Sequence, residues 1–236
     1  MRKKTAFIIP CFNEEENIED LVKSCKEVIK KSDDFIEFIL VNNGSSDTTA
    51  EKLELESNPK IHFVNIIENI GMGNGIKKGL DYAIKLQKYN NYGWTHADLQ
   101  IPSNSLLEAL KIMESEKFNS NKIYIRGKRK NRENLDTIFT FLMACYTSLL
   151  KRGIYYDITG LPVLINKNLI DDVINNSPNG FAFDVFTYIK AKKRGANIIR
   201  FSVDFASRAK GNSSWNTGFL SKIKMSFYYI KEIWKI

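Results

Sequence analysis

Cysteine is scarce in this chain of 236 residues, which has three, at Cys11, Cys25 and Cys145. Their number is odd and their spacing matches no metal-ligand pattern, so the sequence favours neither a disulfide framework nor a structural zinc site. We expect three buried free thiols in a reducing compartment.

Long apolar runs are also absent from the sequence. No stretch approaches the roughly 20 apolar residues that a membrane-spanning helix needs, and the apolar segment 139–146 has polar residues close by on each side. The basic start, Met1–Lys4, precedes an apolar run over 6–10 that is too short for a secretory signal. We therefore expect a cytoplasmic protein, or one that lies on the cytoplasmic face of a membrane without crossing it.

Acidic residues are fewer than basic ones, 27 against 35, which gives a formal charge of +8. This balance favours anionic partners such as nucleotides, phospholipid head groups or nucleic acid. The sequence lacks a helix-turn-helix pattern and an aromatic-basic motif, so nucleic acid is not an expected partner. With 43% hydrophobic and 26% charged residues, the composition is that of an ordinary globular protein with one core.

Short β-like runs alternate with helical patterns through the first half of the sequence. The predicted strands are 5–10, 35–41, 61–66 and 92–95, and the predicted helices are 15–31, 47–56 and 73–87. Alternation of this length predicts an α/β fold with a parallel sheet covered by helices on both faces.

The second half is less regular, with predicted helices over 103–117, 135–150 and 183–194 and predicted strands over 122–126 and 197–203. The last stretch, 217–236, predicts a basic amphipathic helix. One face carries Phe219, Leu220, Ile223, Phe227, Ile230, Ile233 and Trp234, and the other carries Lys224, Lys231 and Lys235. Such a helix suits an anionic membrane surface, although it can also pack on the body of the protein with its lysines in water.

Polar clusters follow three of the predicted strands, over 10–14, 42–47 and 96–100. In open α/β sheets, ligands bind at the carboxyl ends of the strands. Turn chemistry and helix capping can explain each cluster alone. Three clusters on one edge instead predict a binding cleft lined by carboxylates and amides.

Several ordered motifs resemble those of family-2 glycosyltransferases of the GT-A fold. They are Phe7-Ile8-Ile9-Pro10-Cys11-Phe12-Asn13-Glu14, Val41-Asn42-Asn43-Gly44-Ser45-Ser46-Asp47, Asn69-Ile70-Gly71-Met72-Gly73 and Ala97-Asp98-Leu99-Gln100-Ile101-Pro102. Within the family, dolichol-phosphate mannosyltransferases are the most similar. The resemblance covers roughly residues 5–215 and implies a GT-A (Rossmann-like), mostly parallel sheet. We therefore expect a catalytic domain over 1–215, with the helix over 216–236 as part of the same unit.

The resemblance also implies a divalent cation, Mg²⁺ or Mn²⁺, which neutralises the departing diphosphate of a nucleotide-sugar donor. Asp98 matches the second acidic position of the family's D-x-D-like motif, whereas His96 stands at the first. His96 can be a second metal ligand, a contact of the diphosphate or a packing residue, and a role behind the ligands is also open.

The donor site that the resemblance implies has further members. They are Pro10, Phe12, Glu14, Leu40, Asn42, His96, Ala97, Asp98 and Arg129. Asn42-Asn43 replaces an acidic pair that is common in the family, and an amide lacks the charge-assisted hydrogen bond of a carboxylate. Arg129 lies in a basic segment, 127–132, that we interpret as a loop.

Three further residues are implied at the acceptor and phosphate end of the cleft, namely Asp157, Arg208 and Lys210. The last Lys of the family's late R-x-x-G-x-S-K segment is Ser214 here, so Lys210 is the candidate to replace it. Trp215, which follows this segment, can be a sugar or lipid platform or a packing residue.

Asp184 is the candidate catalytic base, because an acidic residue near this place in the family deprotonates an acceptor hydroxyl. Its structural alternative is an N-cap, and an anionic lipid phosphate would need no base. The sequence thus predicts an enzyme that passes a sugar, with inversion, to a polyprenyl-phosphate or lipid-linked acceptor at a membrane. Alternatives are transfer to a hydroxyl of a surface polysaccharide, or an inactive nucleotide-sugar binding protein, since Asn42, Asn43 and His96 replace acidic residues.

Overall fold

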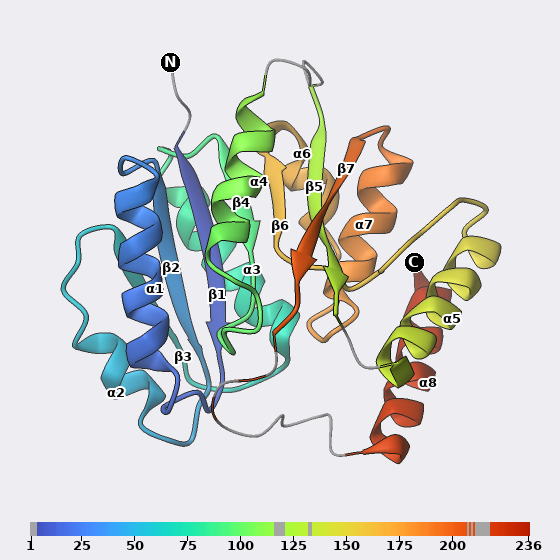
Figure 1. The fold of residues 1–236 in the computed structure, drawn as a ribbon, viewed down its shortest axis with the longest axis horizontal. Helices are drawn as coiled ribbons and strands as arrows, with labels where there is room; N and C mark the ends of the chain where they lie inside the picture. The colour runs from blue at the N-terminus through green and yellow to red at the C-terminus, as the bar shows by residue number, and fades with distance from the viewer. Residues whose placement is uncertain (1–3, 116–120, 132–133, 207, 209, 211–217) are drawn as a thin grey trace.

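A seven-stranded sheet forms the centre of the protein, in the order β3-β2-β1-β4-β6-β5-β7 (Figure 1). The computed structural model describes residues 4–115, 121–131, 134–206, 208, 210 and 218–236. The strands are β1 (Thr5–Cys11), β2 (Ile36–Asn43), β3 (Ile61–Ile66), β4 (Asn91–Trp94), β5 (Ile123–Lys130), β6 (Val163–Asn166) and β7 (Asn197–Asp204). β6 runs antiparallel to both of its neighbours, and the other pairs are parallel. The predicted α/β GT-A-like fold, with a mostly parallel sheet, is confirmed.

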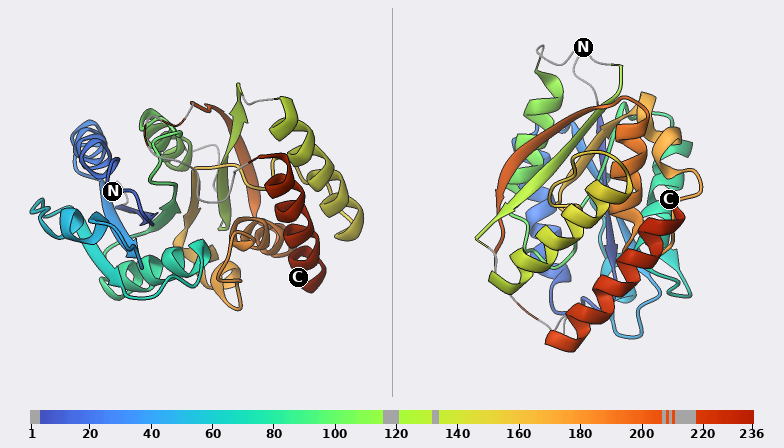
Figure 2. Two further views of the ribbon diagram at one scale, coloured as in Figure 1. Left: turned by 90° about the horizontal axis from the view of Figure 1, so that it is seen from below. Right: turned by 90° about the vertical axis from the view of Figure 1, so that its right-hand side faces the viewer.

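Helices cover both faces of the sheet, as the alternation of elements predicted. They are α1 (Ile18–Lys31), α2 (Thr49–Glu54), α3 (Met72–Lys85), α4 (Asn104–Glu114), α5 (Asn134–Leu150), α6 (Lys167–Ile174), α7 (Phe183–Lys193) and α8 (Phe219–Lys235). α1 and α4 lie on one face, and α3, α6 and α7 lie on the other (Figure 2). β1 and β2 are buried along almost their whole length and are mainly apolar, as expected for strands covered on both sides.

Two elements of the second half were not predicted, β6 and α6. β6 has four residues, and α6 begins directly after it, so no turn signal separates the two in the sequence. The segment 127–132 was interpreted as a loop, which is wrong for its described part, because β5 continues to Lys130. Arg129 pairs there with Val203 of β7, and Lys128 and Lys130 are exposed on either side of it, so the alternation of a strand accounts for the basic residues.

α5 and α8 lie side by side beyond the β7 edge of the sheet (Figures 1 and 2). The apolar residues predicted to share one face of α8 divide in the structure: Ile233 is buried, whereas Leu220, Phe227 and Trp234 are exposed. Among the described helices, none has both the length and the apolarity required to cross a bilayer. Cys11 and Cys25 are buried free thiols as predicted, but the prediction is wrong for Cys145, which is exposed on α5.

Candidate active site

The loops that follow β1 and β2 are joined to each other by hydrogen bonds at the carboxyl edge of the sheet. The Asn13 backbone N–H donates to Ser45 Oγ at 3.1 Å, and the Ser46 N–H donates to Asn13 Oδ1 at 2.9 Å. The Glu14 N–H donates to Thr49 Oγ1 at 2.9 Å. The first two polar clusters of the sequence therefore form one surface.

Gly44 lets a third loop approach this surface. Its φ of 73° lies in the left-handed region, and a Cβ at this position would lie 2.4 Å from the backbone nitrogen of Asn69. A side chain would thus collide with main-chain atoms that have no room to move. This explains why glycine stands in the middle of the motif after β2.

Asp98 lies next to Glu14 and Arg208, which come from far apart in the sequence. Arg208 Nη2 lies 3.1 Å from Glu14 Oε1 and 3.7 Å from Asp98 Oδ2. The segment that carries Arg208 is attached to the loop after β4, where Gln100 and Ala206 exchange two hydrogen bonds of 3.0 Å. The Arg208 guanidinium thus lies between two carboxylates. An incoming phosphate can bind it, because phosphate competes with the carboxylates for the same N–H donors.

Glu14 is half-buried, and this burial raises the pKa of its carboxyl group, against the hydrogen bond from Asn17 and the charge of Arg208. Asp98 raises the pKa of Glu14 further, whereas His96 lowers it. The four charged or titratable groups, Glu14, His96, Asp98 and Arg208, are thus close enough to influence one another.

The fit of a divalent cation depends on Asp98 and His96. Within the described part of the chain, no three His, Cys, Asp or Glu side chains are arranged to hold a metal ion. Asp98 Oδ1 also accepts a hydrogen bond of 3.1 Å from the Gln100 N–H, which leaves Oδ2 as the oxygen that faces Arg208. A cation held by one or two protein ligands is typical of Mg²⁺ sites that are completed by substrate phosphates and water. The residues therefore fit a cation that arrives with a diphosphate.

The other residues predicted to bind the nucleotide-sugar donor differ in their solvent exposure. Pro10 and Phe12 are half-buried at the end of β1. Leu40 is a core residue of β2, and Ala97 is buried as well. The amide of Asn42 is used inside the protein, because its nitrogen donates to Asn65 at 2.7 Å and its oxygen accepts from the Ser45 N–H at 3.1 Å.

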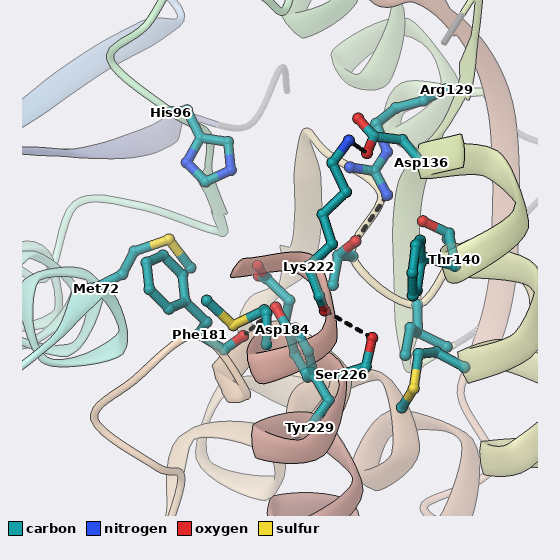
Figure 3. Close-up of a pocket in the computed structure, with 15 residues that line it drawn as sticks. Met72, His96, Arg129, Asp136, Thr140, Phe181, Asp184, Lys222, Ser226 and Tyr229 are labelled. Atoms are coloured by element: carbon teal, nitrogen blue, oxygen red, sulfur yellow. Dashed lines mark hydrogen bonds and ion pairs between the residues drawn. The ribbon is translucent and has the colours of Figure 1, made fainter. Parts of the chain in front are cut away.

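A cavity of about 140 Å³ adjoins this cluster (Figure 3), which is room for several water molecules. His96 lies on one side of the cavity, Arg129 and Asp184 lie in its wall, and α5 and α8 close it. The residues that α5 and α8 contribute are Asp136, Phe139, Thr140, Met143, Lys222, Met225, Ser226 and Tyr229. The cavity therefore joins residues at the end of β4 to the C-terminal helix.

Arg129 and Asp157 form an ion pair in the cavity wall, in which Nη2 of Arg129 donates to Oδ1 and its backbone N–H donates to Oδ2 at 2.9 Å. Burial alone would raise the pKa of Asp157, but the Arg129 guanidinium outweighs it, and the net pKa lies below the usual value. Arg129 also donates to Thr159 Oγ1 at 2.7 Å. Asp157 therefore orients Arg129 toward the cavity.

Asp184 is 3% exposed and accepts a 2.7 Å hydrogen bond from Nε1 of Trp94. Burial raises the pKa of the Asp184 carboxyl group, while Trp94, His96 and the two arginines of β5 lower it in part. The N-cap position of α7 belongs to Ala182, and no side chain caps this helix. The N-cap interpretation of Asp184 is therefore wrong, since its carboxylate faces Trp94 and the cavity.

Lys210 lies apart from the cavity, where its Nζ is 2.7 Å from Asp20 on α1. Ser214 and Trp215 lie outside the described residues. Sequence reasoning missed Lys222, which lines the cavity and forms an ion pair with Asp136 (Figure 3). Lys222 lies on the side of α8 that faces the cavity. Around the helix axis it falls away from the three lysines predicted to share the outer face, and this is the sequence signal that could have found it.

The sheet order and the covering helices are those of a GT-A-like α/β fold. Residues 6–163 match the family model of glycosyl transferase family 2, and the chain belongs to this family.

Relatives and solved structures agree with this assignment. An uncharacterized protein of Methanocaldococcus jannaschii is 25% identical over 86% of this chain and 89% of its own length. The poly-beta-1,6-N-acetyl-D-glucosamine synthase of Staphylococcus aureus is 28% identical over 81% of this chain, which spans 46% of that enzyme. Glucosyl-3-phosphoglycerate synthase of Mycobacterium tuberculosis, crystallised with Mn²⁺, UDP and glucosyl-3-phosphoglycerate, shares the fold, with a TM-score of 0.71, 14% identity, and coverage of 99% of this chain and 79% of that one.

Proposed function

We propose that the protein transfers a sugar from a nucleotide-diphosphate sugar to a hydroxyl group of a lipid-linked acceptor at a membrane surface, with inversion. One observation carries the proposal. The cavity lined by Asp184 and Arg129 also includes His96, and it therefore lies next to the cluster of Glu14, His96, Asp98 and Arg208. A donor whose diphosphate lies at that cluster would have its sugar directed into the cavity. The donor and the acceptor would therefore bind at adjacent places in the fold.

At the donor end, Asp98 would hold Mg²⁺ or Mn²⁺ together with diphosphate oxygens, and His96 is the candidate second ligand. A bound cation would draw negative charge from the departing diphosphate. Arg208 lies 3.7 Å from Asp98 and would supply a second positive group to the same phosphates. Support for a metal comes from the mycobacterial neighbour, whose structures include Mn²⁺ with UDP or UDP-glucose.

At the acceptor end, Asp184 would take the proton from the acceptor hydroxyl. A raised pKa suits a general base, because a carboxylate of ordinary pKa is too weak to accept a proton near neutral pH. The hydroxyl oxygen would then attack the anomeric carbon opposite the departing diphosphate, which inverts the configuration. Arg129 and Lys222 would position anionic groups of the acceptor in the cavity.

A second candidate function is transfer to a polyprenyl phosphate. It is favoured by the two cations in the cavity wall, Arg129 and Lys222. The phosphate oxygen is already anionic and needs no base, so the two candidates differ in their dependence on Asp184.

Donor binding tests the proposal through thermal unfolding in the presence of UDP-, GDP- and CDP-sugars, each with and without Mn²⁺. We expect one base to stabilise the protein only when the metal is present. A ligand at about 100 times its Kd adds about 2.7 kcal/mol, or roughly 5 to 10 °C in Tm for a chain of this size. Asp98→Asn is expected to lose the metal-dependent part of the shift.

Asp33→Asn is the matched control. Asp33 precedes β2 at the opposite end of the sheet, and its φ of 51° is one that Asn tolerates well. This variant should keep the full shift. A Tm that responds to none of the donors would overturn the proposal, and tight binding without release of nucleoside diphosphate in the presence of acceptor would favour an inactive nucleotide-sugar binding protein.

A further inference from the structure

The outer side of α5 is an apolar stripe. Its exposed large side chains are Leu135, Ile138, Phe141, Leu142 and Leu149. Their spacings of three, three, one and seven residues place them along one side of the helix. Leu149 is 83% exposed and Phe141 is 64% exposed. Single exposed apolar residues are common on proteins, whereas a continuous row of them marks a contact surface.

The outer side of α8 carries a second stripe, in which apolar and basic residues alternate. Leu220, Phe227 and Trp234 are exposed at a spacing of seven residues, and Lys224 and Lys231, also exposed, lie between them. Lys235 is exposed too and pairs with Glu232 at 2.5 Å. A lysine between apolar residues can extend its ammonium group to a lipid phosphate while the apolar groups enter the acyl region.

Acidic side chains are kept off these two stripes. Of the described side chains of α5 and α8, none of the exposed ones is acidic. Asp136 and Glu232 are partly buried, and each is paired with a lysine. The surface formed by the two stripes is therefore apolar and positively charged, which is complementary to an anionic bilayer.

The inner sides of the same two helices line the cavity. Phe139, Thr140 and Met143 of α5 face it, as do Met225 and Tyr229 of α8. The stripes and the cavity thus lie on opposite sides of a wall that is one helix thick. A bilayer at the stripes would thus lie about one helix diameter, roughly 10 to 12 Å, from the cavity.

We propose that α5 and α8 form the docking surface by which this protein binds an anionic lipid bilayer. This proposal rests on the proposed function, because a lipid-linked acceptor lies in a membrane and the protein must bind that membrane to reach it. Its physical basis is independent of catalysis, since it depends on the exposed apolar rows and on the lysines between them.

Co-sedimentation with vesicles tests the proposal, using phosphatidylcholine alone and phosphatidylcholine mixed with phosphatidylglycerol. The wild-type chain should bind the mixed vesicles. The double substitution Phe141→Ser with Leu142→Ser should lower the partition coefficient by about tenfold or more, because it removes two of the inserting groups. Lys224→Glu with Lys231→Glu should cause a similar loss and should abolish the preference for the anionic vesicles.

The control is Leu55→Ser with Ile67→Ser, which removes two apolar side chains that are at least as exposed but lie on the far side of the sheet. This variant should bind vesicles like the wild type. Binding that is absent in the wild type, or equal in all variants, would overturn the docking surface, as would a dimer in solution that Phe141→Ser with Leu142→Ser dissociates.

Donor-induced stabilisation separates the two proposals. If it persists while vesicle binding fails, the docking surface alone is wrong. If it is absent while vesicles bind, the proposed function fails.

Discussion

Two buried carboxylates stand at opposite ends of the protein, and their surroundings differ. Glu37 lies at the start of β2 and is 2% exposed. Four groups approach it: His62 Nε2 at 3.0 Å, Lys88 Nζ at 2.6 Å, Tyr89 Oη at 2.7 Å and Lys4 Nζ at 3.4 Å. Asp184, beside the cavity, is 3% exposed, and its carboxylate accepts a hydrogen bond from Nε1 of Trp94.

The pKa values of these two groups move in opposite directions. Burial raises the pKa of each, but at Glu37 the hydrogen bonds from His62, Lys88 and Tyr89 outweigh it and keep the pKa well below the ordinary value. At Asp184 the burial prevails. Of two carboxylates with similarly small exposure, Glu37 is thus kept charged by the lysine, histidine and tyrosine donors around it, whereas Asp184 is suited to accept a proton because burial prevails there.

Asp184→Asn should have the largest effect on activity. We expect transfer to a hydroxyl acceptor to fall by about 10²- to 10⁴-fold, because the amide cannot accept the proton. The free energy of unfolding should stay the same or rise, since a buried charge is removed. Initial rates with a radiolabelled donor, together with urea unfolding, measure both quantities. A loss of less than about tenfold would instead favour the polyprenyl-phosphate acceptor.

Glu37→Gln should show the opposite pattern. The change leaves two lysines and a histidine around a neutral amide, and breaking a buried ion pair costs about 3 to 5 kcal/mol. Because Lys88 and Lys4 keep some contact with water, we expect a loss of about 3 kcal/mol in the urea unfolding free energy. Turnover per folded molecule should be unchanged. A variant that keeps its stability but loses activity would contradict the division between the two ends.

The pH dependence of stability sharpens the same contrast. The folded-state pKa of Glu37 is depressed, so its stabilising effect is present above its unfolded pKa of about 4.3 and is lost as the pH falls below that value. The destabilisation caused by Glu37→Gln should therefore shrink between pH 6 and pH 3. Asp184 has a raised folded pKa, so the stability gained by Asp184→Asn is greatest above that pKa and disappears in acid. Urea unfolding of the three proteins across this range tests both slopes.

The cluster around Glu14 and Asp98 could be predicted from the sequence because its residues follow short, buried strands. Parallel strands end on the same edge, so the polar residues after β1, β2 and β4 had to meet there, and Glu14 and Asp98 do. Other contacts join distant parts of the chain and could not be predicted in this way. Arg208 reaches Glu14 from 194 positions away, and Lys222 lines the cavity from a helix whose orientation depends on its packing against α5. Periodicity could not predict which side of that helix faces inward, because Leu220 and Ile233 are both apolar and only the latter is buried.

The smallest expected effect concerns the Trp94 indole, which donates a hydrogen bond to Asp184, the proposed base. The hydrogen bond of 2.7 Å from Trp94 lowers the pKa of the Asp184 carboxyl group. Trp94→Phe removes this hydrogen bond, so the pKa of Asp184 should rise further. We expect transfer at neutral pH to fall by about tenfold, or 1.4 kcal/mol, and the acidic limb of the pH–rate profile to move to higher pH. Tyr92→Phe, in the same strand, removes a buried hydroxyl that bonds the Tyr89 carbonyl and should leave the profile in place. An unshifted profile with Trp94→Phe would mean that the indole serves packing alone and does not influence the Asp184 carboxyl group.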